Sequence, residues 1–151
     1  MANVRGCNLP DELLYDVENH IWYQEAGDGN VRLGMTTVAT AMAGQLVAFT
    51  PKKAGRSVDA GKSCATVESG KWVGPAKSAA AGAVVQVNDE MVAKPSLANE
   101  DPYGKGWMVV LKPADWAAVK ATLTPGSQVA AKYEAKMAAD GFAGCEPACP
   151  T

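Results

Sequence analysis

The sequence has little of what nucleic-acid-binding and membrane-spanning proteins require. Aromatic residues make up only 7 %, and 14 basic against 16 acidic residues leave a formal net charge of −2. No basic surface for nucleic acid is therefore expected. The most apolar interior window, 38–49, contains polar residues and is too short to cross a bilayer. Because the first residues also lack the apolar run of a signal peptide, we expect a cytoplasmic protein without membrane contact.

Histidine and cysteine are scarce as well. His20 is the one histidine, so no second histidine could share a metal with it, and we expect a half-buried strand residue bonded to a neighbouring loop. The sequence contains four cysteines. In the cytoplasm these are expected to be thiols, redox groups or ligands rather than static disulfides. Cys64 lies within a predicted strand and is expected to be a buried small hydrophobic residue.

Short strands separated by turn residues dominate the pattern. The chain of 151 residues has the length of one domain. Predicted strands cover 13–23 (one or two strands), 31–33, 45–49, 57–62 (a short strand and turn), 63–67, 83–87 and 106–111. Predicted helices cover 38–43, 114–120 and 128–140, whereas 91–99 is expected to be a turn with little helix. Such spacing is typical of a mainly β fold, a sandwich or flattened barrel of short strands with a C-terminal helix.

The helix ends have recognisable signals. Thr36 or Thr37 can cap the first helix and Gly44 can end it. Pro113 suits the first position of the second helix. In the third helix, Val129, Tyr133 and Met137 share one stripe, and Gly141 follows it. We therefore expect an N-terminal segment (1–12), a folded domain (13–140) and a flexible cysteine-containing tail (141–151).

One lysine stands in a break between strand-like runs. Glu68-Ser69-Gly70-Lys71-Trp72 separates the runs 63–67 and 83–87, which predicts a lysine at a hairpin tip. A solvated lysine with extended flanking backbone can be gripped and acylated by an enzyme, although an ordinary surface lysine is the alternative. Gly70 frees the backbone at this tip. Trp72 would either lie against an attached arm or shield the hairpin.

The residues around this lysine resemble a known family. Besides Glu68-Ser69-Gly70-Lys71, the stretches 19–22, 27–36 and 99–107 match the H protein of the glycine cleavage system, and the likeness runs without gaps from about 20 to 112. The resemblance implies a lipoyl-type fold and a non-catalytic, monomeric carrier with lipoate in amide linkage to Lys71. It further implies that Glu68 and Ser69 are read by a lipoate-attaching ligase or transferase.

The remaining cysteines suggest a variant of that family. Gly6-Cys7 and the stretch from Cys145 to Cys149 resemble the lipoate-binding proteins of bacterial sulfur oxidation, which serve a heterodisulfide-reductase-like complex. That likeness implies a sulfur-containing intermediate on the arm and recycling by a dihydrolipoamide dehydrogenase. The alternative is the ordinary H-protein role, in which the arm shuttles an aminomethyl group. A binding module that has lost its arm is a third hypothesis.

The state of these cysteines is open from sequence. Cys145 and Cys149 are four residues apart, with Pro147 opposing a regular helix between them. A reversible disulfide between them, exchange with a partner's thiol, and an inert tail are all compatible with this spacing. A zinc site would need Cys7 and a further ligand, and is disfavoured because no histidine is near.

Overall fold

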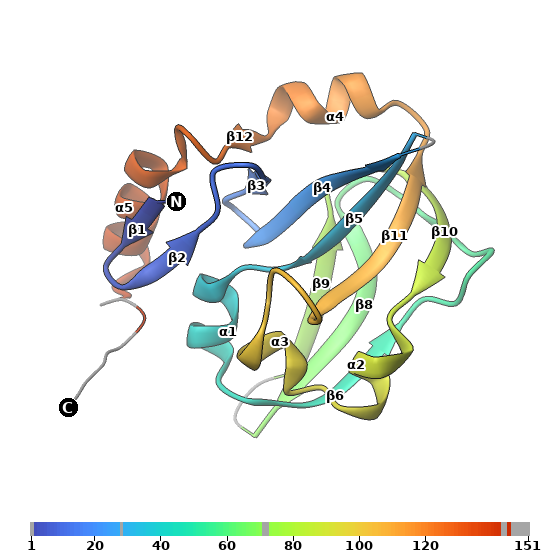
Figure 1. The fold of residues 1–151 in the computed structure, drawn as a ribbon, viewed down its shortest axis with the longest axis horizontal. Coiled ribbons are helices and arrows are strands. Elements are labelled where there is room, and N and C mark those ends of the chain that lie inside the picture. The colour runs from blue at the N-terminus through green and yellow to red at the C-terminus, as the bar shows by residue number, and fades with distance from the viewer. Residues whose placement is uncertain (1, 28, 71–72, 143–144, 146–151) are drawn as a thin grey trace.

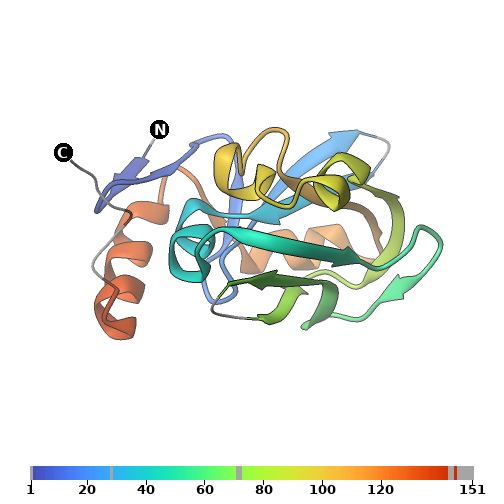
Figure 2. The same ribbon diagram turned by 90° about the horizontal axis from the view of Figure 1, so that it is seen from below.

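Two antiparallel β-sheets form the body of the protein. The computed structural model describes residues 2–27, 29–70, 73–142 and 145 (Figure 1). The larger sheet contains, in spatial order, β12 (Thr124–Pro125), β3 (Leu14–Asp16), β4 (Ile21–Gly27), β5 (Asn30–Met35), β11 (Trp107–Pro113), β10 (Gly82–Val87) and β7 (Ser57–Val58). The smaller sheet contains β6 (Leu46–Pro51), β8 (Lys62–Ser69) and β9 (Val73–Ser78). Figure 2 shows the two sheets as separate layers, which confirms the predicted mainly β architecture.

The main core lies between these sheets. Strand residues alternate between faces, so one face of each strand can be apolar while the other is polar. In β8 this gives buried Val67 and Ser69 beside exposed Thr66 and Glu68. The core side chains of the larger sheet include Ile21, Tyr23, Val31, Leu33, Val109 and Leu111, and those of the smaller sheet include Leu46, Phe49, Cys64, Val67 and Ala76.

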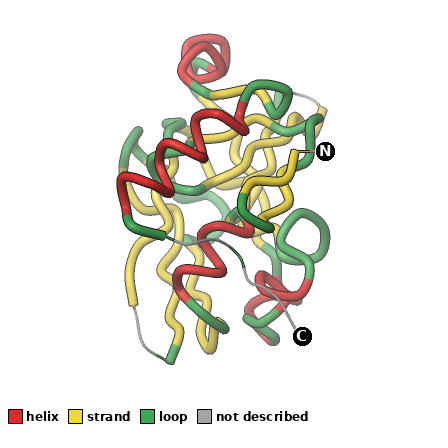
Figure 3. The backbone as a smooth tube through the Cα atoms, turned by 90° about the vertical axis from the view of Figure 1, so that its left-hand side faces the viewer, coloured by secondary structure: helices red, strands yellow, loops and turns green. Residues whose placement is uncertain are grey.

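A second apolar cluster lies on the other face of the larger sheet. The hairpin of β1 (Ala2–Val4) and β2 (Cys7–Leu9) and the helix α5 (Val129–Asp140) cover this face. Figure 3 shows α5 and the β1–β2 hairpin side by side at this end of the molecule. The cluster consists of Val4, Cys7, Leu9, Leu13, Tyr15, Trp22, Val38, Val129, Tyr133 and Met137. Val4, Cys7 and Leu9 thus share a core with the C-terminal helix, whereas the boundaries drawn at 12 and 140 stay a prediction.

The predicted caps of the first and last helices are confirmed. Helix α1 (Thr37–Ala43) begins after Thr36, whose hydroxyl accepts a hydrogen bond from the amide of Ala39, and ends at Gly44 with φ of 85°. In α5 the predicted stripe of Val129, Tyr133 and Met137 is buried. Gly141 ends α5 in the left-handed conformation, as a glycine after a helix allows.

Two helical regions differ from the sequence prediction. Pro113 does not begin a helix but ends β11, and α4 (Trp116–Thr122) starts after Asp115, whose carboxylate accepts from the amide of Ala118. The stretch predicted as a turn contains α2 (Asp89–Ala93) and α3 (Leu97–Glu100). Its helical content was underestimated because the cap of α2 comes from Asn88, which also donates to carbonyl oxygens near β11.

Among the described residues, no helix is long and apolar enough to cross a membrane.

Candidate functional site

The predicted hairpin exists, but its second strand is not the predicted one. β8 pairs with β9, from Lys62 opposite Ser78 to Glu68 opposite Val73. The predicted partner, 83–87, lies in the larger sheet as part of β10 and pairs with β11. No strand was predicted for 73–78, and a proline in the centre of a sheet would remove a ladder hydrogen bond. The structure accommodates Pro75 because β9 is an edge strand.

The residues that end β8 have different orientations. Glu68 is exposed, whereas Ser69 is 5 % exposed and lies on the inner face. A Cβ built on Gly70 would have no atom within 4 Å, so the backbone there is open to solvent. Lys71 and Trp72 lie outside the described residues, and their predicted roles stay predictions. Of the two predicted recognition residues, Glu68 is therefore the one that an enzyme can contact directly.

Apolar side chains surround this carboxylate. Val73, directly opposite Glu68, is 62 % exposed. On the other side of β8, Ala48 pairs with Glu68, and Val47 next to it is 58 % exposed. Exposed valines on strands that flank a carboxylate give the end of the hairpin a mixed apolar and acidic surface. Such a surface suits contact with another protein.

A cleft of about 690 Å³ opens beside the same hairpin. Its lining residues are Glu18, Asn19, His20, Ile21, Met35, Ala39, Met42, Ala43, Val67, Pro75, Ala76 and Lys77. Val67 is three residues before Gly70, which is about 10 Å along a β-strand. The mostly apolar lining matches the aliphatic chain and sulfur-containing ring of a lipoyl group. The residues present therefore fit that group.

His20 lines this cleft, and the prediction for its burial and its partner is confirmed only in part. It is half-buried as expected, but it precedes β4 in a turn with φ of 58°, and its partner is a helix residue rather than a loop. Its Nδ1 is 3.2 Å from the hydroxyl of Tyr133 on α5. The two rings stack with centroids 5.6 Å apart. Burial, and secondarily the charge of Lys136, lowers the pKa of His20.

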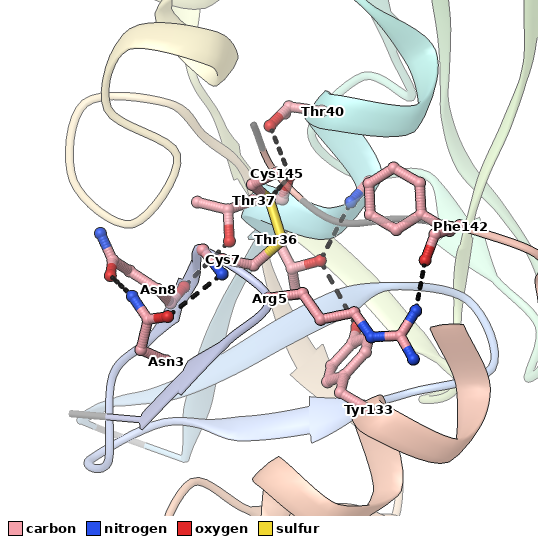
Figure 4. Close-up of a disulfide and its surroundings, with 12 residues drawn as sticks. Asn3, Arg5, Cys7, Asn8, Thr36, Thr37, Thr40, Tyr133, Phe142 and Cys145 are labelled. Atoms are coloured by element: carbon pink, nitrogen blue, oxygen red, sulfur yellow. Dashed lines mark hydrogen bonds between the residues drawn. A yellow bond between two sulfur atoms is a disulfide. The ribbon is translucent and has the colours of Figure 1, made fainter. Parts of the chain in front are cut away.

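For two of the cysteines, the expected free thiols or metal ligands are not what the structure shows, whereas their predicted redox role stays a prediction. Cys7 and Cys145 form a disulfide with a Cα–Cα distance of 5.0 Å (Figure 4), so they are neither free thiols nor metal ligands, and Cys145 is not paired with Cys149. Cys149 lies outside the described residues. The bond joins residues 138 positions apart, so no local pattern could reveal it. The sequence feature that could have suggested this pairing is the presence of a cysteine near each end of the sequence.

The β1–β2 turn explains how these two cysteines meet. Arg5 and Gly6 both have positive φ, which folds β2 back on β1. A Cβ on Gly6 would lie 2.6 Å from the carbonyl oxygen of Cys145, so only glycine permits this approach. The amide of Cys145 donates to the carbonyl of Arg5 at 3.0 Å. Cys145 therefore packs on the turn.

Cys64 is confirmed as a buried hydrophobic residue. Its side chain has no exposed surface and lies in the main core. Its sulfur is 3.4 Å from the carbonyl oxygen of Ala76. Burial raises the pKa of its thiol to about 12, which suppresses thiolate formation and redox reactivity.

Fold and site together define a class: a small two-sheet domain whose edge hairpin carries a lysine in its connecting sequence, beside an apolar cleft. The chain belongs to the glycine cleavage H-protein family, whose model matches residues 13–136.

Individual proteins support this assignment. Glycine cleavage system H protein 5 of Aquifex aeolicus (strain VF5) is 48 % identical over 134 residues, covering 86 % of this chain and 90 % of that protein. A probable glycine cleavage system H protein 2 of Sulfurisphaera tokodaii is 44 % identical over 114 residues, covering 74 % and 77 %. The crystal structure of a glycine cleavage system H protein from Mycobacterium marinum superposes with a TM-score of 0.71 at 32 % identity, covering 88 % and 99 %.

Membership of this family identifies the chain as a cofactor carrier. H proteins are non-catalytic carriers with lipoate attached covalently to a lysine. They act with a lipoate ligase and with glycine cleavage enzymes such as dihydrolipoamide dehydrogenase. The carrier supplies position, while the chemistry belongs to the cofactor.

Proposed function

We propose that Lys71 carries the lipoyl group and that the chain passes an aminomethyl group between glycine cleavage enzymes, as the names of its relatives indicate. The observation that supports this most directly is the β8–β9 hairpin, since Glu68-Ser69-Gly70-Lys71 ends one strand and continues into the link to the next. The open backbone at Gly70 gives an attaching enzyme access from outside the sheet.

The chain's own residues would bind and shield the arm. When attached, lipoate supplies a disulfide that opens to thiolate attack and closes again on oxidation. Exposed Glu68 offers an acceptor for the attaching enzyme, and the valines beside it offer apolar contact. Ile21, Met35 and Met42 line the nearby cleft and would keep water away from an apolar arm.

Intact-mass measurement tests the attachment. Protein produced in a lipoate-competent host should carry the mass of one lipoyl group, and Lys71→Arg should abolish this adduct. Lys62→Arg, at the exposed opposite end of β8, is the matched control and should retain the adduct. No adduct on the unmodified sequence would favour the binding module without an arm. An adduct that persists in Lys71→Arg would place the site on another lysine.

One specific observation favours a second candidate function, in which the lipoyl arm carries a different chemical group. Three of the similar proteins are numbered H proteins of one strain, Aquifex aeolicus VF5, with 48 %, 41 % and 42 % identity to this chain. Several carriers in one organism would allow some to serve other enzymes. The candidate for such a role here is a sulfur-containing intermediate passed to a heterodisulfide-reductase-like complex and recycled by dihydrolipoamide dehydrogenase.

Two assays separate the loads. Incubation of the lipoylated protein, with its ring in the oxidised disulfide form, with a glycine decarboxylase and glycine should load an aminomethyl group if the first function is right: loss of CO2 from glycine leaves an electron pair that forms the new carbon–sulfur bond as the ring disulfide opens to one free thiol. Incubation of the lipoylated protein with thiosulfate should instead add sulfur to the arm if the second is right. In both assays Lys71→Arg is the blank. We also propose a cytoplasmic monomer.

A further inference from the structure

The disulfide joins two segments at the start of α1. Cys7 ends the β1–β2 turn, and Cys145 follows α5 (Figure 4). The Sγ of Cys145 lies 3.5 Å from the carbonyl oxygen of Thr37, the first residue of α1. Arg5 adds a second link between the hairpin and the end of α5, because its guanidinium donates to the carbonyl of Phe142 at 2.9 Å and to Glu134 at 2.6 Å.

Further hydrogen bonds converge on the same point. The hydroxyl of Thr37 donates to the carbonyl of Asn8, next to Cys7, at 2.9 Å. Tyr103 donates its hydroxyl hydrogen to that same carbonyl at 2.6 Å and accepts from the amide of Thr37 at 3.0 Å. The capping hydroxyl of Thr36 is 3.4 Å from the hydroxyl of Tyr133. The first turn of α1 is therefore bonded to β2 and contacts α5.

Helix α1 is also a wall of the cleft beside the hairpin. Ala39, Met42 and Ala43 line that cleft, and Ala43 and Gly44 line a smaller depression with Gly70. With only seven residues, α1 is too short to be stable without tertiary contacts. Its order therefore depends on tertiary contacts, which are those of its buried residues Val38, Thr40 and Ala43 and those of its first turn.

We propose that the Cys7–Cys145 disulfide is a redox-sensitive clamp on α1. In the oxidised form the clamp anchors the first turn of α1 and keeps the cleft wall in place. A dithiol opens the clamp by exchange: its thiolate attacks the Sγ of Cys145, the less buried residue of the pair, Cys7 leaves as the thiolate, and the second thiol closes a cyclic disulfide on the reductant. Two electrons and two protons pass to the cysteines. Local unfolding of α1 then loosens the cleft.

Hydrogen exchange measured by mass spectrometry tests this proposal. The full-length Lys71→Arg variant is used, so that a lipoyl ring cannot consume the reductant. After treatment with dithiothreitol, exchange of the amides of 37–43 should accelerate by about tenfold, and these amides should still exchange much faster than those of the central strands β5 and β11, which open only by global unfolding. The double variant Cys7→Ser/Cys145→Ser should show the same acceleration without reductant. Cys149→Ser should behave like the parent in both states.

Each other outcome contradicts the proposal. Faster exchange confined to β1 and β2 would show that the clamp does not reach the cleft. An equal increase in every strand and helix would show global destabilisation rather than local release. Unchanged exchange in a protein whose two cysteines have become alkylatable would show that the disulfide anchors nothing.

Discussion

Gly34 lies directly beneath the indole of Trp22, so closely that a Cβ on the glycine would be 2.7 Å from the ring. The ring cannot retreat, because it is fully buried and its Nε1 donates to the carbonyl of Pro102 at 2.9 Å. Gly34→Ala should therefore lower the free energy of unfolding by about 1–3 kcal/mol, the usual cost of overpacking.

Chemical denaturation measures this effect. Gly70→Ala is the matched control, because the new methyl group would meet no atom within 4 Å and should leave stability unchanged. Equal stability of Gly34→Ala and the parent would mean that Trp22 has more room than the structure shows.

The disulfide should contribute strongly to stability. It closes a loop between residues 138 positions apart. The loss of chain entropy in the unfolded state predicts a stabilisation of at most about 5 kcal/mol for a loop of this size. Denaturation with and without dithiothreitol should show a large fall in the midpoint for the parent and no further fall for Cys7→Ser. A reductant effect of equal size in that variant would assign the destabilisation to something else.

Acidification should weaken the fold through His20. Burial lowers the pKa of this histidine, so the folded protein favours the neutral ring. The unfolded chain takes up the proton near pH 6.5. The stabilisation is therefore complete above that pH and is lost as the pH falls through the lower folded-state pKa. His20→Asn keeps a residue that tolerates the positive φ and removes the titration.

The measurement is the free energy of unfolding at a series of pH values. Between about pH 5 and 7 the parent should lose stability on acidification more steeply than His20→Asn, since carboxylates titrate mainly below this range. Parallel curves would show that His20 has the same pKa in both states.

Glu68 should control lipoylation without affecting the fold. Its carboxylate is exposed at the end of β8, where an attaching enzyme can bond it. Loss of one charge-assisted hydrogen bond of about 1.5–3 kcal/mol predicts that Glu68→Ala slows lipoylation by roughly 10- to 100-fold. Glu90→Ala, an exposed carboxylate on α2, should modify at the parental rate. Rates are read from intact-mass time courses with a purified ligase. Equal rates for both variants would remove Glu68 from recognition.

Local patterns predicted several elements correctly. Thr36 and Gly44 at the ends of α1, and the stripe of Val129, Tyr133 and Met137, could be identified because capping and helical periodicity involve residues within a few positions of each other. Burial of Cys64 was predicted because a cysteine in the middle of a strand usually behaves as a small buried hydrophobic residue. The strand β9 was missed, because Pro75 is acceptable only at a sheet edge and edge position is a property of the assembled sheet.

By itself, the sequence determined the mainly β class, the family resemblance and the attachment motif at 68–71, since each depends on residues that are close along the chain. Only the tertiary structure decided that Cys7 meets Cys145, that His20 stacks on Tyr133, and that α1 forms a wall of the cleft. Those contacts join residues far apart in the sequence. Their partners are selected by how the sheets and helices pack, which no local pattern encodes.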